Sequence, residues 1–230
     1  MIPSTNNALA AQKVYDFVGP AYEAAFQGLK TQAASVEWLL SQLETMGIER
    51  ATIVDIGCGS GRPVCSILAD GGHDILGIDI SPVMIAAARE RVPNARFEQM
   101  DIRDFSSPDN YYDAVTAYFS MVAFVTQQEI MDFVAKIYRM VRPGGLFVFA
   151  SVPAQVEDLH VTVMGVSVAM SSLGREEMID WFRRVGFQVE YEAVSHFTPR
   201  GAEAGLCNPG DVWEETHIFI YAKKPSVVGR

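Results

Sequence analysis

A glycine-rich turn followed by an acidic residue could form a ligand-binding site in this sequence. The turn comes directly after a predicted strand over residues 51–56 and contains Gly57, Gly59 and Gly61. Glycines at such a place let the backbone bend sharply and approach a ligand closely. Asp79 lies eighteen residues beyond Gly61, at the end of the next predicted strand. A carboxylate there accepts hydrogen bonds from ribose hydroxyls.

A second acidic residue, Asp101, ends the third predicted strand. Its carboxylate is expected to accept the exocyclic amine of an adenine, while the Ile102 amide donates to a ring nitrogen. The third glycine of the dinucleotide fingerprint is replaced by Arg62, so close approach to a pyrophosphate is not expected. The spacing therefore favours a smaller, phosphate-free nucleoside ligand in a crevice at the carboxyl ends of parallel strands.

Alternating strand and helix patterns predict how these residues are positioned. Strands are predicted over residues 51–56, 74–79, 95–100, 112–118 and 146–152, and helices over 63–70, 82–91 and 130–141. The first fifty residues have helical spacing throughout. Strands separated by helices predict an α/β fold with a doubly wound parallel sheet and helices on both faces.

The last third of the chain has a different pattern. A helix over 174–185 is followed by two predicted strands, 187–194 and 217–223, with no helix between them. These strands are expected to pair antiparallel at one edge of the sheet. Residues 153–173 and 195–212 show little regular pattern and are predicted to be long loops at the mouth of the site.

Composition excludes several classes of function. The 230 residues carry 18 basic and 28 acidic side chains, and this net charge of −10 disfavours nucleic acids and anionic membranes as partners. No apolar run reaches the length of a membrane span, and the amino terminus lacks the features of a signal peptide. Three cysteines without a Cys-x-x-Cys pair favour a reducing cytoplasm. We expect a cytoplasmic protein with a small-molecule substrate, as a monomer or a homodimer.

The order of motifs DIGCGSG, GIDIS, QMDIRDF, YDAVTAYFS and VRPGG resembles the class I S-adenosylmethionine-dependent methyltransferases, from about residue 10 to 224. Within that superfamily it is similar to the fungal and bacterial small-molecule enzymes. The resemblance implies a Rossmann-like sheet of seven strands in the order 3-2-1-4-5-7-6, with strand seven antiparallel. It implies one domain over 1–230, made of a helical lid (1–50), a cofactor-binding core (51–152) and a substrate-side insert with the antiparallel edge (153–230).

The resemblance also implies a role for individual residues toward S-adenosylmethionine. It assigns the methionine part to Gly57, Cys58 and Gly59, the ribose to Asp79, the adenine to Asp101 and Ile102, the amino group to the backbone at Ala117 and Tyr118, and the adenosine faces to Ile80 and Met84. Tyr15 and Tyr22, seven residues apart on a predicted helix over 8–26, are similar to the family's lid tyrosines.

The chemistry implied by the family needs neither a metal nor a covalent nucleophile, and no metal is predicted. A sulfonium methyl group is already electrophilic, and positioning alone contributes roughly 7–11 kcal/mol. Small-molecule members often carry a histidine shortly after strand four. In this chain Ala123, which follows Phe119-Ser120-Met121-Val122, stands at that position, so the histidine is missing. The candidates for a general base are therefore His217, which follows two glutamates, and His196 and His160 in the long connections.

The stretch 158–172 resembles the family's substrate-covering insert. Together with this insert, Phe119, Met121, Met164 and Met170 are predicted to form an apolar wall around the substrate. The alternative is that these methionines only fill the hydrophobic core.

Two rival functions stay open at this point: a cyclisation or rearrangement that keeps the cofactor, and binding of the cofactor without catalysis. A nucleic-acid methyltransferase would show an Asn/Asp-Pro-Pro-Tyr motif after strand four, and a nicotinamide dehydrogenase a different glycine spacing. The acceptor atom, whether oxygen, nitrogen, sulfur or carbon, is not determined by the sequence.

Overall fold

A seven-stranded mixed sheet forms the centre of the protein. The structure is a computed structural model that describes residues 5–226. The strands are β1 (Thr52–Ile56), β2 (Asp74–Asp79), β3 (Arg96–Gln99), β4 (Tyr112–Tyr118), β5 (Val141–Ser151), β8 (Gln188–Phe197) and β9 (Glu215–Lys223). Their order is β3-β2-β1-β4-β5-β9-β8, in which β1 to β5 are parallel and β9 is antiparallel to both β5 and β8. The predicted fold class, strand order and antiparallel edge are confirmed.

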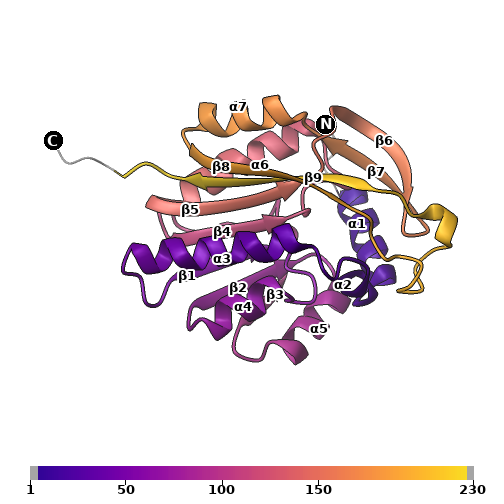
Figure 1. The fold of residues 1–230 in the computed structure, drawn as a ribbon, viewed down its shortest axis with the longest axis horizontal. Coiled ribbons are helices and arrows are strands. Elements are labelled where there is room, and N and C mark those ends of the chain that lie inside the picture. The colour runs from indigo at the N-terminus through magenta and orange to yellow at the C-terminus, as the bar shows by residue number, and fades with distance from the viewer. Residues whose placement is uncertain (1–4, 227–230) are drawn as a thin grey trace.

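Helices cover both faces of this sheet (Figure 1). On one face lie α3 (Lys30–Thr45), α4 (Val64–Asp70) and α5 (Pro82–Arg91), and on the other α6 (Gln127–Met140) and α7 (Arg175–Val185). Each face has its own cluster of buried apolar side chains, so β4 is buried along its whole length. Burial on two faces explains why the central strands appear in the sequence as continuous apolar runs.

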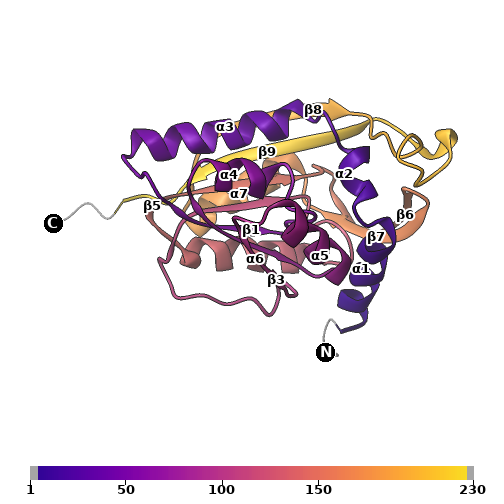
Figure 2. The same ribbon diagram turned by 90° about the horizontal axis from the view of Figure 1, so that it is seen from below.

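The N-terminal segment forms two helices, α1 (Thr5–Val18) and α2 (Ala21–Ala25), rather than the predicted single helix over 8–26. The break lies at Gly19, whose φ of 48° leaves the right-handed helical region, and Pro20 follows. Both helices lie at the carboxyl ends of the parallel strands (Figure 2). They are therefore placed over the edge of the sheet where the acidic residues were predicted to meet.

Residues 153–173 are not a long loop, which corrects the sequence prediction. They contain a hairpin of β6 (Val156–Val163) and β7 (Val166–Ser172), a separate two-stranded sheet. Its turn is Met164-Gly165, and both residues have positive φ, 50° and 75°. Such a two-residue turn matches the twist of an antiparallel pair, and next to the turn valines alternate with polar residues, in Val161-Thr162-Val163 and Val166-Ser167-Val168. The hairpin lies beside α1, at the same end of the molecule as α2 (Figures 1 and 2).

Two smaller predictions also need correction. The predicted turn at 142–145 lies inside β5, where the pairing with β4 shifts register between Tyr112 and Ala114. The predicted loop at 195–212 begins later, because β8 continues to Phe197, and it contains the short 3-10 helix η1 (Pro209–Asp211). No helix in the described part of the chain is long and apolar enough to cross a membrane.

Candidate functional site

The glycine-rich turn after β1 and the end of β2 are joined by hydrogen bonds. Asp79 accepts one from the Gly59 amide at 2.9 Å through Oδ2 and one from the Ser81 amide at 2.9 Å through Oδ1. Gly57 and Gly59 have φ of 71° and 53°. A Cβ on Gly57 would lie 2.3 Å from the Ser120 Cβ, whereas one on Gly59 would meet no atom within 4 Å. Gly57 is thus required by packing, and Gly59 leaves space open for a ligand.

The Asp79 carboxylate is largely withdrawn from water. Burial raises the pKa of Asp79, the Ser81 and Gly59 amides oppose that rise, and Asp16 adds to it. A carboxylate has about four lone-pair sites, so two amide bonds leave acceptors free for further donors. Hydroxyl donors such as those of a ribose suit this position.

Asp101 is held by a residue that the sequence analysis did not single out. Arg103 donates to Asp101 from Nε at 2.9 Å and from Nη2 at 2.7 Å, and its Nη1 lies 3.4 Å from Glu129. The sequence signal that could have indicated this ion pair is the spacing Asp-x-Arg, which places the two side chains within one turn. Arg103 fixes the carboxylate and balances its charge, which helps a second acidic group to lie near Asp79.

These residues line a cavity at the carboxyl ends of the strands. A cavity of about 100 Å³ adjoins one of about 450 Å³, and both are lined by Tyr22, Gly57, Gly59, Met84, Tyr118 and Phe119; together they are called the glycine-loop cavity. Of the residues predicted to bind the cofactor, eleven line it: Tyr15, Tyr22, Gly57, Cys58, Gly59, Asp79, Ile80, Met84, Asp101, Ile102 and Tyr118.

Ala117 is the predicted residue that lies apart from this cavity. Its side chain is fully buried in the core against α6, because successive residues of β4 face opposite sides of the sheet. The Tyr118 ring belongs to the cluster on the α3 face, and its hydroxyl shares a hydrogen bond of 2.7 Å with Ser35. The end of β4 is thereby anchored on α3, and Phe119 and Ser120 continue along the cavity wall.

Tyr15 and Tyr22 meet over the site although they come from different helices. Their ring centroids are 6.2 Å apart in an edge-to-face arrangement. Burial and then Asp79 raise the pKa of Tyr15 to about 12. Burial, Tyr15, Glu215 and Asp79, in that order, raise the pKa of Tyr22 well above its ordinary value. At neutral pH both hydroxyls keep their protons and can only serve as neutral hydrogen-bonding groups.

Polar contacts tie α1 and α2 to the core. Asp16 accepts from the Ser81 hydroxyl at 2.6 Å, and Ser81 also caps α5 by accepting from the Met84 amide. Glu23 accepts from the Ser60 hydroxyl at 2.6 Å and forms an ion pair with Arg91. The two helices are held over the glycine-loop cavity by three side chains of the core, Ser60, Ser81 and Arg91.

A second cavity, of about 430 Å³, lies under the β6–β7 hairpin and is called the hairpin cavity. Its wall includes Phe119, Met164 and Met170, three of the four residues predicted to contact a substrate. The fourth, Met121, is buried and lines the glycine-loop cavity instead. The two cavities meet at five residues that line both: Tyr15, Tyr22, Phe26, Phe119 and Ala123.

The structure brings none of the three candidate histidines into either cavity. His217 is fully buried because β9 turns it to the face shared with Phe219, and its ring lies 4.5 Å from that of Phe119. His196 lies on the edge strand β8, and the His160 side chain on β6 is 70% exposed. Two acidic residues near His217, Glu214 and Glu215, do line the hairpin cavity, and Glu215 Oε2 lies 2.9 Å from His217 Nε2.

Within residues 5–226, no three His, Cys, Asp or Glu side chains are grouped closely enough to share a metal ion.

Comparisons with known proteins find methyltransferases among the relatives of this chain. Residues 53–145 match the model of a methyltransferase domain family. The chain is 29% identical over 154 residues to the malonyl-acyl-carrier protein O-methyltransferase of Enterobacter lignolyticus, a match covering 67% of this chain and 57% of that protein. The chain spans about half the length of the curated relatives it matches.

Solved structures share the fold over almost the whole chain. The magnesium protoporphyrin IX methyltransferase of Synechocystis, with bound SAH, has a TM-score of 0.65 at 13% identity, covering 95% of this chain and 99% of that one. The (4+2)-cyclase SpnF has a TM-score of 0.63 at 19% identity, covering 94% and 95%.

Proposed function

We propose that this chain, which belongs to the class I S-adenosylmethionine-dependent methyltransferase family, methylates a small molecule held in the hairpin cavity. The observation that carries the proposal is the junction of the two cavities. One is lined by the acidic and glycine residues that suit a nucleoside, the other is mainly apolar, and they share Tyr15, Tyr22, Phe26, Phe119 and Ala123. A donor and an acceptor in these two cavities would meet at that junction.

The residues of the glycine-loop cavity fit S-adenosylmethionine. Asp79 would accept the ribose hydroxyls, Asp101 and the Ile102 amide would bind the adenine, and the open space beside Gly59 would take the methionine part. When bound, this cofactor supplies an electrophilic methyl group on a positively charged sulfur. The role left to the protein is to align the acceptor and to exclude water, which is worth roughly 7–11 kcal/mol.

The size and the apolar wall of the hairpin cavity support a small-molecule acceptor. Its volume of about 430 Å³ lies within the ~300–1,000 Å³ range of small-molecule sites, and its wall is mostly aliphatic and aromatic. The net charge of −10 also disfavours a nucleic acid.

A cyclisation or rearrangement without methyl transfer is the second candidate. No histidine from among the three candidates reaches the hairpin cavity, and an apolar cavity could fold a reactive substrate by shape alone. The same fold is found in the cyclase SpnF.

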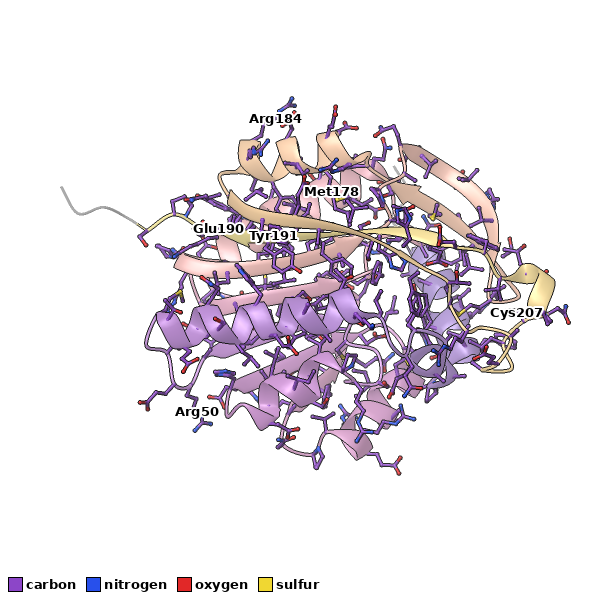
Figure 3. The ribbon with its side chains drawn as sticks, viewed as in Figure 1. Arg50, Met178, Arg184, Glu190, Tyr191 and Cys207 are labelled. Atoms are coloured by element: carbon purple, nitrogen blue, oxygen red, sulfur yellow. The ribbon has the colours of Figure 1, made fainter. Side chains whose placement is uncertain are left out.

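Calorimetry tests the cofactor site. Asp79→Asn should weaken binding of S-adenosylmethionine about 10- to 100-fold, as expected for hydrogen bonds to a charged group. Asp74→Asn is the matched control, because Asp74 begins the same strand and pairs with Arg50, which lies far from α1 and α2 (Figure 3). Unchanged affinity in a folded Asp79→Asn variant would refute the ribose assignment.

Incubation with the cofactor and a fractionated metabolite extract then separates the two candidate reactions. Methyl transfer releases one S-adenosylhomocysteine for each product formed. Product formation without S-adenosylhomocysteine would favour the second candidate.

A further inference from the structure

We propose that Glu215 determines which acceptors enter the hairpin cavity: apolar molecules whose reacting group carries an N–H or O–H, and not carboxylates. This inference rests on the proposed function and specifies its substrate class. Glu215 is the first residue of β9, and its side chain forms part of the wall of the hairpin cavity.

The charges in the cavity wall are all negative. The lining includes Glu214 and Glu215 but no lysine, arginine or histidine, and most of the remaining surface is apolar. An anionic ligand would enter such a space without a compensating charge, which is costly in a partly desolvated site. A hydrogen-bond donor, by contrast, would pair with the one carboxylate that the cavity keeps away from water.

Glu215 rather than Glu214 is that carboxylate. The Glu215 side chain is 17% exposed, whereas that of Glu214 is 67% exposed and lies 3.9 Å from His196 on the sheet edge. Charge-assisted hydrogen bonds are strong where water is excluded. Glu214 therefore shares the charge of Glu215 but not its environment.

His217 fixes the position of Glu215. The two side chains project from the same face of β9, and His217 Nε2 donates to Glu215 Oε2 at 2.9 Å. The imidazole is fully buried against the Phe119 ring and near those of Phe26 and Phe197. Its Nδ1 is buried without a partner, which fits the tautomer with the proton on Nε2. This bond leaves Glu215 Oε1 for a ligand, so His217 acts as a positioning residue.

Glu215 also lies near the junction of the two cavities. After burial and Tyr15, the charge of Glu215 contributes to the raised pKa of Tyr22, and Tyr22 lines both cavities. A donor group bound to Glu215 would thus be held on the side of the hairpin cavity that faces the cofactor.

Three rigid probes of one shape test the proposal: 1-adamantanamine, 1-adamantanol and 1-adamantanecarboxylate, titrated by calorimetry into the protein saturated with S-adenosylhomocysteine. The amine and the alcohol should bind at least about tenfold more tightly than the carboxylate. Glu215→Gln should abolish this preference. Glu214→Gln, the charge-matched control, should retain it.

Two histidine variants test the positioning role. His217→Gln keeps a nitrogen donor near the place of Nε2 and should retain most of the preference, whereas His217→Leu removes the donor and should reduce it severalfold. Thermal unfolding checks that each variant folds. Should His217→Leu not fold, the comparison of Glu215→Gln with Glu214→Gln still decides the proposal.

The outcomes separate this inference from the proposed function. Equal binding of the three probes, no binding of any probe, or a preference that survives Glu215→Gln would overturn the inference while S-adenosylhomocysteine still binds. Failure of the protein to bind S-adenosylhomocysteine in the preceding titration would instead refute the proposed function.

Discussion

Replacing Gly59 with alanine should impair cofactor binding with only a modest loss of stability. Gly59 has a φ of 53°, and its added Cβ would meet no protein atom within 4 Å. The methyl group would project into the glycine-loop cavity, where the methionine part of the cofactor is proposed to lie. Gly57 is unsuitable for this test, because a Cβ there would clash with Ser120 and would disturb the fold itself.

The structure provides a matched control for the strain. Gly72, in the turn between α4 and β2, has a φ of 85° and also has no atom within 4 Å of an added Cβ. A left-handed conformation costs an alanine about 1–2 kcal/mol. At about 2–4 °C per kcal/mol, both variants should lose about 2–8 °C in Tm. Only Gly59→Ala should weaken binding of S-adenosylhomocysteine, by at least about tenfold, or about 1.4 kcal/mol.

Calorimetric titration and thermal unfolding of the two variants side by side measure both effects. If Gly59→Ala bound S-adenosylhomocysteine as tightly as Gly72→Ala, the cofactor would not approach the backbone at this glycine. If Gly59→Ala lost far more stability than Gly72→Ala, the open space beside Gly59 would be the wrong account of its role.

Two further predictions concern a buried acid and the N-terminal helices. Burial raises the pKa of Asp55 from 3.8 to about 6, against hydrogen bonds from Thr116 and Cys65. The native state therefore binds this proton more readily than the unfolded chain, and the resulting stability is present below about pH 3.8 and is lost as the pH rises to about 6. Asp55→Asn should gain about 2 kcal/mol relative to wild type between pH 4 and pH 6 in urea unfolding, which is most of the ~3 kcal/mol that the full pKa shift represents, and a pH-independent difference would contradict this. Glu23→Gln weakens the contact of α2 with Ser60 and Arg91, so stopped-flow binding of S-adenosylhomocysteine should be up to about fivefold faster in both directions. Glu37→Gln on α3 is the control, and unchanged rates in Glu23→Gln would show that this contact does not hold α2 closed.

The sheet and much of the glycine-loop cavity could be predicted from the sequence because their signals are local. The strands at 74–79 and 112–118 and the helix at 82–91, with its Ser81 cap, are found with the predicted bounds. Strand ends in a parallel sheet meet at one edge whatever the details of packing, so Asp79 and Asp101 had to lie near one another. The hairpin was missed although its alternation and its Met164-Gly165 turn are present in the sequence.

Tertiary structure alone decided which titratable side chain of β9 faces the hairpin cavity. Alternation along β9 puts Glu215 and His217 on one face, but it does not say where along that face the core ends and the cavity begins. Packing of Phe26, Phe119 and Phe197 around His217 sets that boundary, and these residues come from three distant parts of the chain. The sequence by itself determined the fold and the edge of the sheet where the glycine-rich turn, Asp79 and Asp101 meet, since these follow from periodicity and chain order. The burial of His217 and the exposure of Glu215 to the cavity depend on contacts between residues far apart in the sequence, which no local pattern encodes.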